Sequence, residues 1–362
     1  MNKPVYYDGT KLLSMKDING NEPEIYMVTT NRTGGKTTYF NRLAVNRFLD
    51  GRVRKFATLY RYKTDIDSTI GDRFFKDIKE LFFQDFHMTS ERRAGGAYYE
   101  MFLQKVNRDD PDDETETVKK SCGYAIAINS AEKIKRESHL LSDVDMIIFD
   151  EFQSESSSYC ANEVQKFMSL HDSIARGGGK QARRVPVYML SNPVSLINPY
   201  YTEMGISQRI NTDTNFLRGE GFILEQGYNE TASKAISGSG FHQAFSGNKY
   251  SAYSSQAIYL NDNEAFIEKP PGHSSYVCTL RYMGKDYALR EFSEFGIIYC
   301  DDKPDTSYPQ KISVTTDDHR INYVMLKRND YFFSQLRYLF EQGSFRFKDL
   351  SCKEVIMRAL SY

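Results

Sequence analysis

The sequence is poor in cysteine and has no tryptophan among its 362 residues. Its five cysteines are odd in number, and none lies at a Cys-x-x-Cys spacing. This argues against a disulfide framework or a zinc cluster and favours a reducing cytosol. No apolar stretch approaches the roughly 20 residues that span a bilayer. The N-terminal segment "MNKPVYYDGTKLL" also lacks the apolar core of a signal peptide. We therefore expect no membrane partner.

A net charge of one sign is missing as well. The chain has 47 Lys and Arg against 48 Asp and Glu, for a formal net charge of -1. No global basic field draws nucleic acid to it, so such binding must come from local clusters. With 40% hydrophobic and 26% charged residues, the chain has the composition of a soluble globular protein. Its length is enough for two domains.

The segment "TTNRTGGKTTYF" (29–40) resembles a Walker A phosphate loop in which Thr30 replaces the first glycine. The run "EIYMVTT" before it predicts a strand. The apolar spacing of "TTYFNRLAVNRFLD" after it predicts a helix, so the turn has the context that a phosphate loop requires. Lys36 would then reach the phosphates and Thr37 would bind Mg²⁺. A chance glycine turn is the alternative.

A second motif makes that alternative less probable. "VDMIIFDEF" (144–152) predicts a buried strand that ends in Asp150 and Glu151, as a Walker B element does. Asp150 would bind Mg²⁺ and Glu151 would polarise the attacking water. A strand that ends in solvated acids is the alternative. In P-loop enzymes with an extra strand between the two Walker strands, a catalytic Glu follows the Walker B Asp, and the pair fits that branch.

The next predicted strand, "VPVYMLSN" (185–192), ends in Ser191 and Asn192. Beside the Walker B strand, Asn192 would contact the γ-phosphate or the attacking water. On local grounds alone, a plain Asn-Pro turn explains the pattern equally well.

The order of these elements predicts a mainly parallel α/β ATPase domain over residues 1–210. The polar, Gly- and Ser-rich segment 211–262 is interpreted as a linker or small helical subdomain. Several strands joined at Gly284 and Gly296, followed by a helix, predict a smaller α+β domain over 263–362.

The motifs "NRTGGKT", "IIFDEF", "LSNPVSLINPYY", "FIEK" and "VTTDDH" resemble those of the DNA-packaging ATPases of phi29-like phages, in the same order and at similar spacing. The resemblance is strongest over 25–201. It implies a ring, expected to be a pentamer, docked on the portal of a procapsid in the host cytoplasm. The ring would move double-stranded DNA with ATP and Mg²⁺. The resemblance further implies that the C-terminal domain is a vestigial RNase H-like nuclease that docks to the portal or to a packaging RNA.

The resemblance also extends to individual residues. The nucleotide-binding set would be Asn31, Arg32, Thr33, Gly34, Gly35, Lys36, Thr37 and Thr38. Arg176, at the end of the helix after the Walker B strand, matches the family's position for an arginine supplied to the neighbouring subunit. Favourable charge at a helix end is the alternative for Arg176. Arg32 is a rival that would act within its own subunit.

DNA of any sequence must pass through such a motor, so phosphate contacts without base recognition are expected. Basic residues in "EKIKRES" and "KQARR" are the candidates, although a solvated face explains them equally well. The candidates are Lys133, Lys135, Arg136 and Lys180.

Two other functions remain open at this stage. A terminase-type protein would cut DNA as well as pump it, but the first strand of the C-terminal domain carries no acid. A nucleotide-binding assembly protein without turnover would have no need of Glu151.

Overall fold

The computed structural model describes residues 6–106, 119–135, 141–156, 158–176, 181–207, 209–210, 214–245, 248, 254, 266–326 and 330–360. The acidic stretch 107–120 lies almost entirely outside them. Contacts divide the chain into two compact units. The first comprises 1–196 and 210–261, and the second comprises 197–209 and 262–362.

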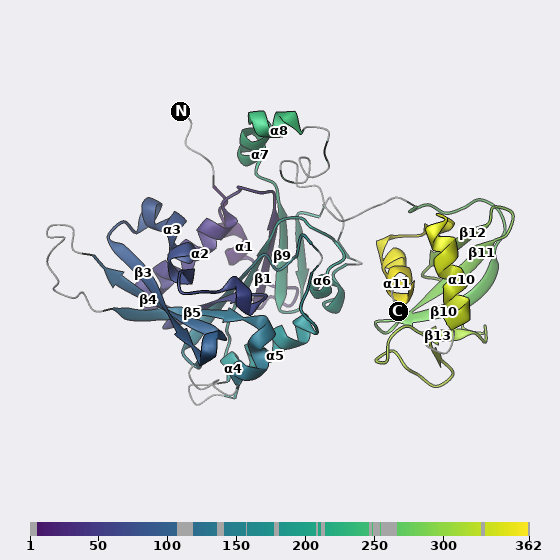
Figure 1. Cartoon of the computed structure of the whole chain (residues 1–362), viewed down its shortest axis with the longest axis horizontal. Helices are drawn as coiled ribbons and strands as arrows, with labels where there is room; N and C mark the ends of the chain where they lie inside the picture. The colour runs from purple at the N-terminus through teal and green to yellow at the C-terminus, as the bar shows by residue number, and fades with distance from the viewer. Residues whose placement is uncertain are drawn as a thin grey trace. The chain divides into compact units, whose positions relative to one another are not determined.

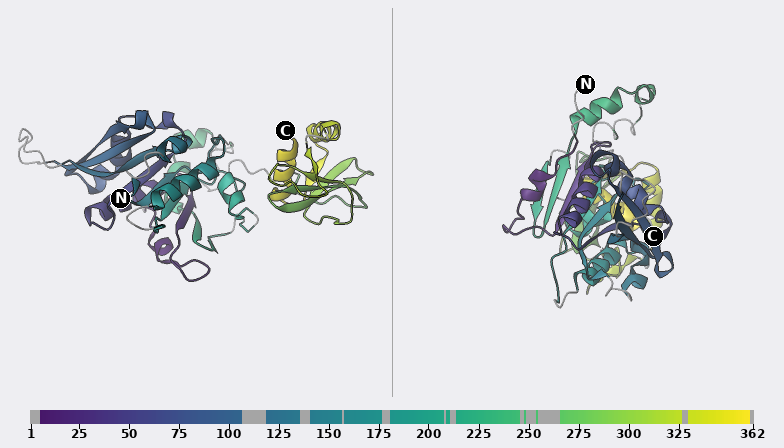
Figure 2. Two further views of the ribbon diagram at one scale, coloured as in Figure 1. Left: turned by 90° about the horizontal axis from the view of Figure 1, so that it is seen from below. Right: turned by 90° about the vertical axis from the view of Figure 1, so that its left-hand side faces the viewer.

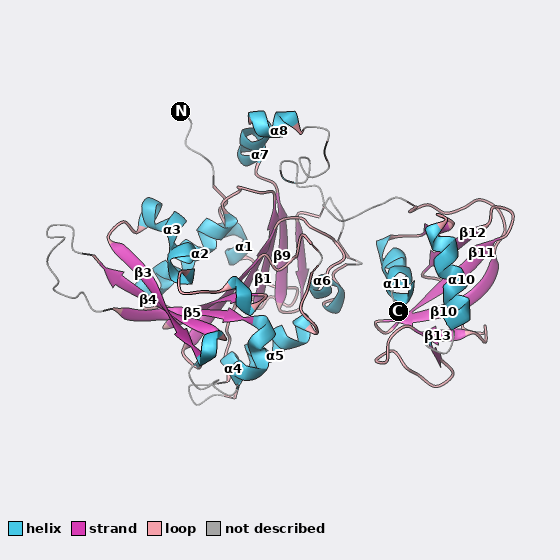
Figure 3. Cartoon of the chain, in the orientation of Figure 1, coloured by secondary structure: helices cyan, strands magenta, loops and turns pink. Residues whose placement is uncertain are grey.

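The first unit is built on a nine-stranded sheet with helices on both of its faces (Figure 3). Its strands are β1 (Ile25–Thr30), β2 (Lys55–Tyr60), β3 (Phe86–Arg93), β4 (Tyr98–Lys105), β5 (Lys120–Ala127), β6 (Val144–Asp150), β7 (Val187–Ser191), β8 (Phe216–Gly219) and β9 (Phe222–Gly227). Its α-helices are α1 (Thr10–Ser14), α2 (Lys36–Leu49), α3 (Ile70–Phe82), α4 (Ala131–Lys135), α5 (Glu163–Ala175), α7 (Glu230–Ser237) and α8 (Gly240–Ala244). Three short 3₁₀ turns are η1 (Lys63–Asp65), η2 (Ala94–Gly96) and η3 (Ile128–Ser130).

The strand order is β3-β4-β5-β2-β6-β7-β1-β9-β8. The six strands from β5 to β9 in that order pair in parallel, and β3, β4 and β8 add antiparallel pairs at the two edges. The sheet is strongly twisted. Strands β3, β4 and β5 run nearly across the direction of β1 and β9 (Figures 1 and 2). As predicted, β7 lies beside the Walker B strand β6, and it separates β6 from the Walker A strand β1.

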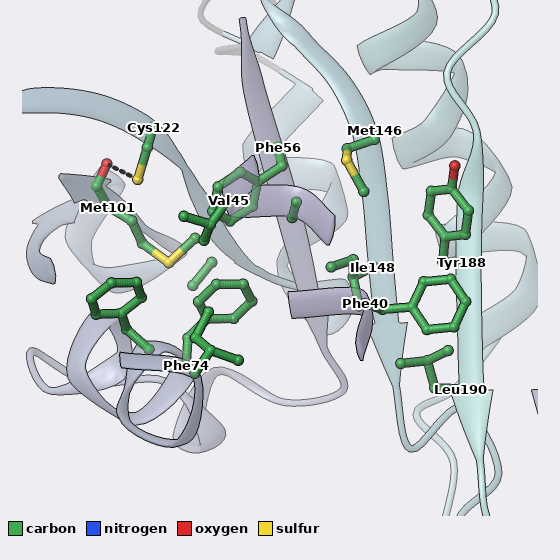
Figure 4. Close-up of a cluster of buried hydrophobic side chains, with 14 of the residues drawn as sticks. Phe40, Val45, Phe56, Phe74, Met101, Cys122, Met146, Ile148, Tyr188 and Leu190 are labelled. Atoms are coloured by element: carbon green, nitrogen blue, oxygen red, sulfur yellow. Dashed lines mark hydrogen bonds between the residues drawn. The ribbon is translucent and has the colours of Figure 1, made fainter. Parts of the chain in front are cut away.

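The main core lies between the sheet and helices α2 and α3. Figure 4 shows Phe40 of α2 and Phe74 of α3 packed toward Phe56, Ile148 and other side chains of the strands. The opposite face is covered by α5, whose Phe167 ring stacks on Phe149 of β6 with ring centroids 6.0 Å apart. Neighbouring residues of β6 thus bury side chains on both faces, which explains the nearly continuous apolar run in that strand.

The second unit has a six-stranded sheet in the order β14-β13-β10-β11-β12-β15. Its elements are α6 (Pro199–Glu203), β10 (Ser275–Tyr282), β11 (Lys285–Phe292), β12 (Ile297–Asp301), β13 (Lys311–Ser313), β14 (Val324–Met325), α10 (Asp330–Glu341), β15 (Phe345–Phe347) and α11 (Leu350–Leu360). Strands β10, β11 and β12 form an antiparallel meander, and β13 and β14 continue it in parallel to β10. This is the strand arrangement of the RNase H-like fold, in agreement with the predicted α+β domain. The predicted turns at Gly284 and Gly296 join the meander.

One feature differs from the sequence-based expectations. Part of the segment 211–262, interpreted as a linker or small helical subdomain, forms β8 and β9. Strand β9 pairs with β1 along its whole length, from Ile25 opposite Phe222 to Thr30 opposite Gly227, so this part belongs to the first sheet. The same segment also contains α7 and α8.

In the described part of the chain, no helix is both long and apolar enough to cross a membrane.

Candidate functional site: a phosphate loop and a carboxylate pair

The turn between β1 and α2 has the backbone of a phosphate loop. Gly35 precedes α2 with a φ of 87°, and Thr33 has a φ of 57°. Helix α2 begins at Lys36 without a side-chain cap, so the N–H groups of its first turn point into the site without a side-chain acceptor. Such a helix N-terminus attracts phosphate through its N–H groups and its dipole.

The missing first glycine is accommodated locally. Thr30 is the last residue of β1, where extended backbone suits a β-branched side chain. In the adjacent strand its partner is Gly227, and a Cβ there would lie 3.0 Å from the Thr30 methyl carbon. The glycine therefore leaves the space that the Thr30 side chain occupies, and the loop needs no extra residue.

Four predicted residues meet at the carboxyl edge of the sheet, where β1, β7 and β6 end side by side. The Lys36 ammonium donates to Asn192 Oδ1 at 2.7 Å. The Thr37 hydroxyl donates to Asp150 Oδ2 at 2.6 Å. A hydroxyl and a carboxylate in contact are hard oxygen donors of the kind that Mg²⁺ takes beside nucleotide phosphates. The residues present thus fit a nucleotide with its magnesium ion.

The electrostatics of the site suit an anion. Lys36 is only 7% exposed, and this burial lowers the pKa of its ammonium, against the charges of Asp150 and Glu151. Burial also raises the pKa of the Glu151 carboxyl, and the charges of Asp150 and Glu155 raise it further, whereas Arg32 and Lys36 oppose the change. Glu151 is therefore a better proton acceptor than an ordinary surface glutamate.

Two further loop residues are held from outside the motif. Arg32 forms an ion pair with Glu155, four residues after Glu151. Asn31 and Asn229 bond each other twice, through the Asn31 amide to the Asn229 carbonyl at 3.1 Å and from the Asn229 N–H to Asn31 Oδ1 at 2.8 Å. Sequence reasoning missed Asn229, because it follows β9, which lies in the segment interpreted as a linker.

Sequence reasoning also missed Arg61, the first residue after β2. Its guanidinium contacts the backbone of Glu151 and Phe152 and the carboxylate of Glu163. The signal available in the sequence was the arginine in "YRYK" directly after a buried strand. Its partners lie about a hundred residues away, so only the strand order reveals the contact.

Arg176 lies far from its own phosphate loop. It caps the C-terminal end of α5, and its side chain is exposed. Since α5 rises about 1.5 Å per residue, Arg176 is roughly 20 Å along the helix from Glu163. That end is tied to the beginning of β6, because Arg183 bonds the Ala175 carbonyl at 3.1 Å and Asp145 at 2.8 Å. Arg176 is thus placed near the opposite edge of the sheet from Glu151.

The predicted DNA contacts are described in part. Lys133 and Lys135 lie on α4 with exposed side chains. Lys133 also lines an open depression of about 500 Å³ together with Asn129, Ser130, Glu132 and Lys166. Arg136 and Lys180 lie outside the described residues.

The acids of the second unit have structural partners. Asp301 accepts from Arg290 at 2.8 Å, and Asp318 accepts from the N–H groups of Met283 and Gly284 at 3.1 and 2.9 Å. Within the described ranges, no group of three or more His, Cys, Asp or Glu side chains is arranged to hold a metal ion.

The sheet order and the site together define a class. A phosphate loop, a Walker B acid pair and an intervening strand that ends in a polar residue are the features of the P-loop branch with an extra central strand. Within that class, the chain belongs to the family of the podovirus DNA encapsidation protein (Gp16), whose model matches residues 114–361.

Individual relatives agree with this family. The DNA packaging protein of Bacillus phage phi29 is 25% identical over 351 residues, covering 96% of this chain and 94% of the relative. That of Bacillus phage B103 is 27% identical over 247 residues, covering 67% of this chain and 73% of the relative. Among solved structures, the bacteriophage Phi-29 viral genome packaging motor assembly matches with a TM-score of 0.66 at 23% identity, over 99% of this chain and 98% of that one. The Phi-28 gp11 DNA packaging motor matches with a TM-score of 0.61 at 17% identity, over 99% of both chains. The shared fold thus extends over nearly the whole chain.

Proposed function

We propose that this protein is a viral DNA-packaging motor that hydrolyses ATP and uses the energy to move double-stranded DNA into a procapsid. The observation that carries the proposal is the constellation at the carboxyl edge of the first sheet. It joins the Lys36–Asn192 contact, the Thr37–Asp150 contact and the Glu151 carboxylate around one phosphate loop. Membership of the DNA encapsidation family supports the view that the energy of hydrolysis is used to move DNA into the procapsid.

Each residue has a role that follows from its chemistry. The N–H groups of the loop and the Lys36 ammonium would bind the phosphates, while Thr37 and Asp150 would hold Mg²⁺. An ammonium has three donors, so Lys36 can keep its bond to Asn192 while it binds a phosphate. Asn192 would then lie beside the terminal phosphate and report its loss to β7. Glu151 would orient the attacking water and accept its proton.

The proposal extends to the assembly. The subunits would form a ring, with five as the expected number, docked on the portal of a procapsid in the host cytoplasm, with or without a packaging RNA. Arg176 is too far from its own loop to reach a phosphate there, which supports a role at the neighbouring subunit's site. Lys133, Lys135, Arg136 and Lys180 would contact the DNA backbone without reading bases.

The test is an ATP hydrolysis assay with and without double-stranded DNA, followed by gel analysis of the DNA. We expect hydrolysis that depends on Lys36 and increases with DNA of any sequence, and DNA that stays intact. Cut DNA would instead support the terminase-type alternative, in which the second unit is an active nuclease. Nucleotide binding without hydrolysis under all conditions would contradict the motor.

A further inference from the structure

Arg61 stands at the junction of three elements of the first unit. It directly follows β2, which pairs with the Walker B strand β6. Its Nε donates to both oxygens of Glu163, at 3.1 and 2.9 Å, and Glu163 is the first residue of α5. Its Nη2 donates to the carbonyls of Glu151 and Phe152, at 3.3 and 2.9 Å. One guanidinium therefore binds the Walker B turn on one side and the start of α5 on the other.

This contact is enclosed by the protein. The side chains of Arg61 and Glu163 are 11% and 1% exposed. The guanidinium lies over the Tyr159 ring at 5.0 Å from its centroid. Glu163 also accepts from the Cys160 N–H at 2.9 Å. A buried ion pair of this kind holds a fixed geometry, because neither charge has water as an alternative partner.

The backbone that Arg61 contacts is in an unusual conformation. Glu151 has a φ of 55°, in the left-handed region that residues with a side chain rarely occupy. The N–H that follows is fixed by the sheet, because Phe152 donates to the Leu190 carbonyl at 3.2 Å. The carbonyls of Glu151 and Phe152 both accept from Arg61. The direction of the Glu151 side chain depends on this turn.

We propose that Arg61, fixed by Glu163, is the positioning residue for Glu151. Arg61 holds the left-handed turn from the side of β2, so that the carboxylate points into the site when the nucleotide is bound. This inference rests on the proposed function, in which Glu151 is the catalytic base. It adds that the base is aimed from the neighbouring strand. It also adds that the same guanidinium anchors the helix that ends at Arg176.

Lysine is the informative replacement for Arg61. Its ammonium keeps the charge opposite Glu163, which preserves the ion pair in the interior. It lacks the planar fork that reaches a carboxylate and two carbonyls together. If Arg61 only neutralised Glu163, Arg61→Lys would be a mild change. If Arg61 aims Glu151, the variant fold would persist while the base is misplaced.

The experiment compares wild-type, Arg61→Lys and Glu163→Gln full-length chains. ATP affinity is measured with a fluorescent ATP analogue, and turnover is measured with saturating ATP and double-stranded DNA. Misplacing a catalytic group by about 1 Å can lower the rate on the order of 100-fold. We therefore expect kcat to fall by about 10- to 100-fold in Arg61→Lys, with the affinity for the analogue and the melting temperature close to wild type. Glu163→Gln should show the same split with a smaller loss, because its amide oxygen still accepts from Arg61.

The matched control is Arg54→Lys, at the other end of the same strand. Arg54 precedes β2 and bonds both oxygens of Asp145, at 3.0 and 2.7 Å, and the Ser142 carbonyl at 3.2 Å, but it lies at the opposite edge. Its kcat should stay within about 2-fold of wild type, as expected for an exposed ion pair away from the chemistry.

A second readout separates aiming from general damage. Adding Arg61→Lys to Glu151→Gln should leave the residual turnover, followed over long incubations with labelled ATP, unchanged, because no base remains to be positioned. Turnover of Arg61→Lys equal to wild type would overturn the proposal. So would a loss of affinity that parallels the loss of kcat, or a further loss in the Glu151→Gln background. Absence of turnover in the wild type itself would overturn the proposed function and this inference together.

Discussion

In the central sheet, clusters of arginine and carboxylate side chains lie both at the amino ends of the strands (the amino edge) and at their carboxyl ends (the carboxyl edge). The two clusters have different roles. At the amino edge, Arg54 and Arg183 share the carboxylate of Asp145, and Arg183 also bonds the Ile174 carbonyl at 3.0 Å. At the carboxyl edge, Arg61 donates to the Glu163 carboxylate and to the carbonyls of Glu151 and Phe152 in the Walker B turn. Both clusters tie a strand end to α5. The amino-edge cluster lies away from the phosphate loop, whereas the carboxyl-edge cluster supports the turn that carries Glu151, next to Asp150. The two clusters thus make similar bonds, and they differ in whether the backbone they hold carries a candidate catalytic side chain.

The strongest challenge to this comparison is Arg176, a candidate catalytic residue near the anchoring edge. We expect Arg176→Ala to bind ATP and to lose about 10³- to 10⁵-fold in hydrolysis, the contribution of arginine fingers in related sites. Mixing it with Lys36→Ala subunits should partly restore turnover, because some interfaces then pair an intact loop with an intact arginine. The measurement is ATPase activity across mixing ratios, in rings whose mixed composition has been verified.

If a verified mixed ring shows no rescue, Arg176 does not act between subunits. The catalytic arginine would then be Arg32, which lies in the loop itself, and chemistry would be confined to the carboxyl edge.

Glu151→Gln is the corresponding change at the carboxyl edge. Turnover should fall by about 10²- to 10⁴-fold, the usual contribution of a general base, with ATP affinity nearly unchanged. The raised pKa of Glu151 further predicts that wild-type turnover falls with decreasing pH at a higher pH than for an ordinary glutamate, because the base must be ionised. A steady-state assay over a pH series checks both points. Hydrolysis within a few-fold of wild type would remove Glu151 from the mechanism.

A smaller effect is expected from the basic residues that follow β5. Neutralising Lys133, Lys135 and Arg136 together should weaken DNA binding without base preference. Each lost phosphate contact should reduce the slope of log K against log salt by about 0.9. Titrations at several salt concentrations, with two unrelated DNA sequences, measure this. An unchanged slope would move the DNA contact elsewhere, with Lys180 as the next candidate.

The smallest effect on turnover is expected from Glu354, which lies outside the first sheet. Burial raises the pKa of its carboxyl to about 7, from 4.5. The folded second unit therefore gains stability from the protonated group below about pH 4.5 and loses it as the pH rises through 7. The loss should be about 1–3 kcal/mol. Calorimetry between pH 5 and 8 should show a flatter dependence for Glu354→Gln, with kcat unaffected; an equally steep dependence in both proteins would exclude the group.

Local patterns predicted most of the elements that form the site. The phosphate loop, the Asp150–Glu151 pair and Asn192 were each predicted from a strand that ends in polar residues, because the carboxyl ends of parallel strands meet at one edge. The resemblance then supplied the RNase H-like second domain, whose strand order agrees with it.

Long-range features were beyond those patterns. Strand β9 was interpreted as part of a linker because Gly- and Ser-rich residues follow it, yet pairing with β1 decides its place. Strand β3, "FHMTSERR", was not predicted, since a charged strand at the sheet edge lacks an apolar signature. The contacts of Arg61 with the Walker B turn and with Glu163 depend on which strands are neighbours, and no local spacing contains that information.

The pairing of Thr30 with Gly227 has a consequence for how such loops are recognised. A chain with glycine at position 30 has room for a side chain at 227, whereas in this chain a Cβ at 227 would lie only 3.0 Å from the Thr30 methyl carbon. We expect positions 30 and 227 to vary together among homologues. Where position 30 of the motif is not glycine, position 227, nearly two hundred residues later, should be glycine. A search for the consecutive motif alone would pass over such proteins, although their phosphate loops are intact.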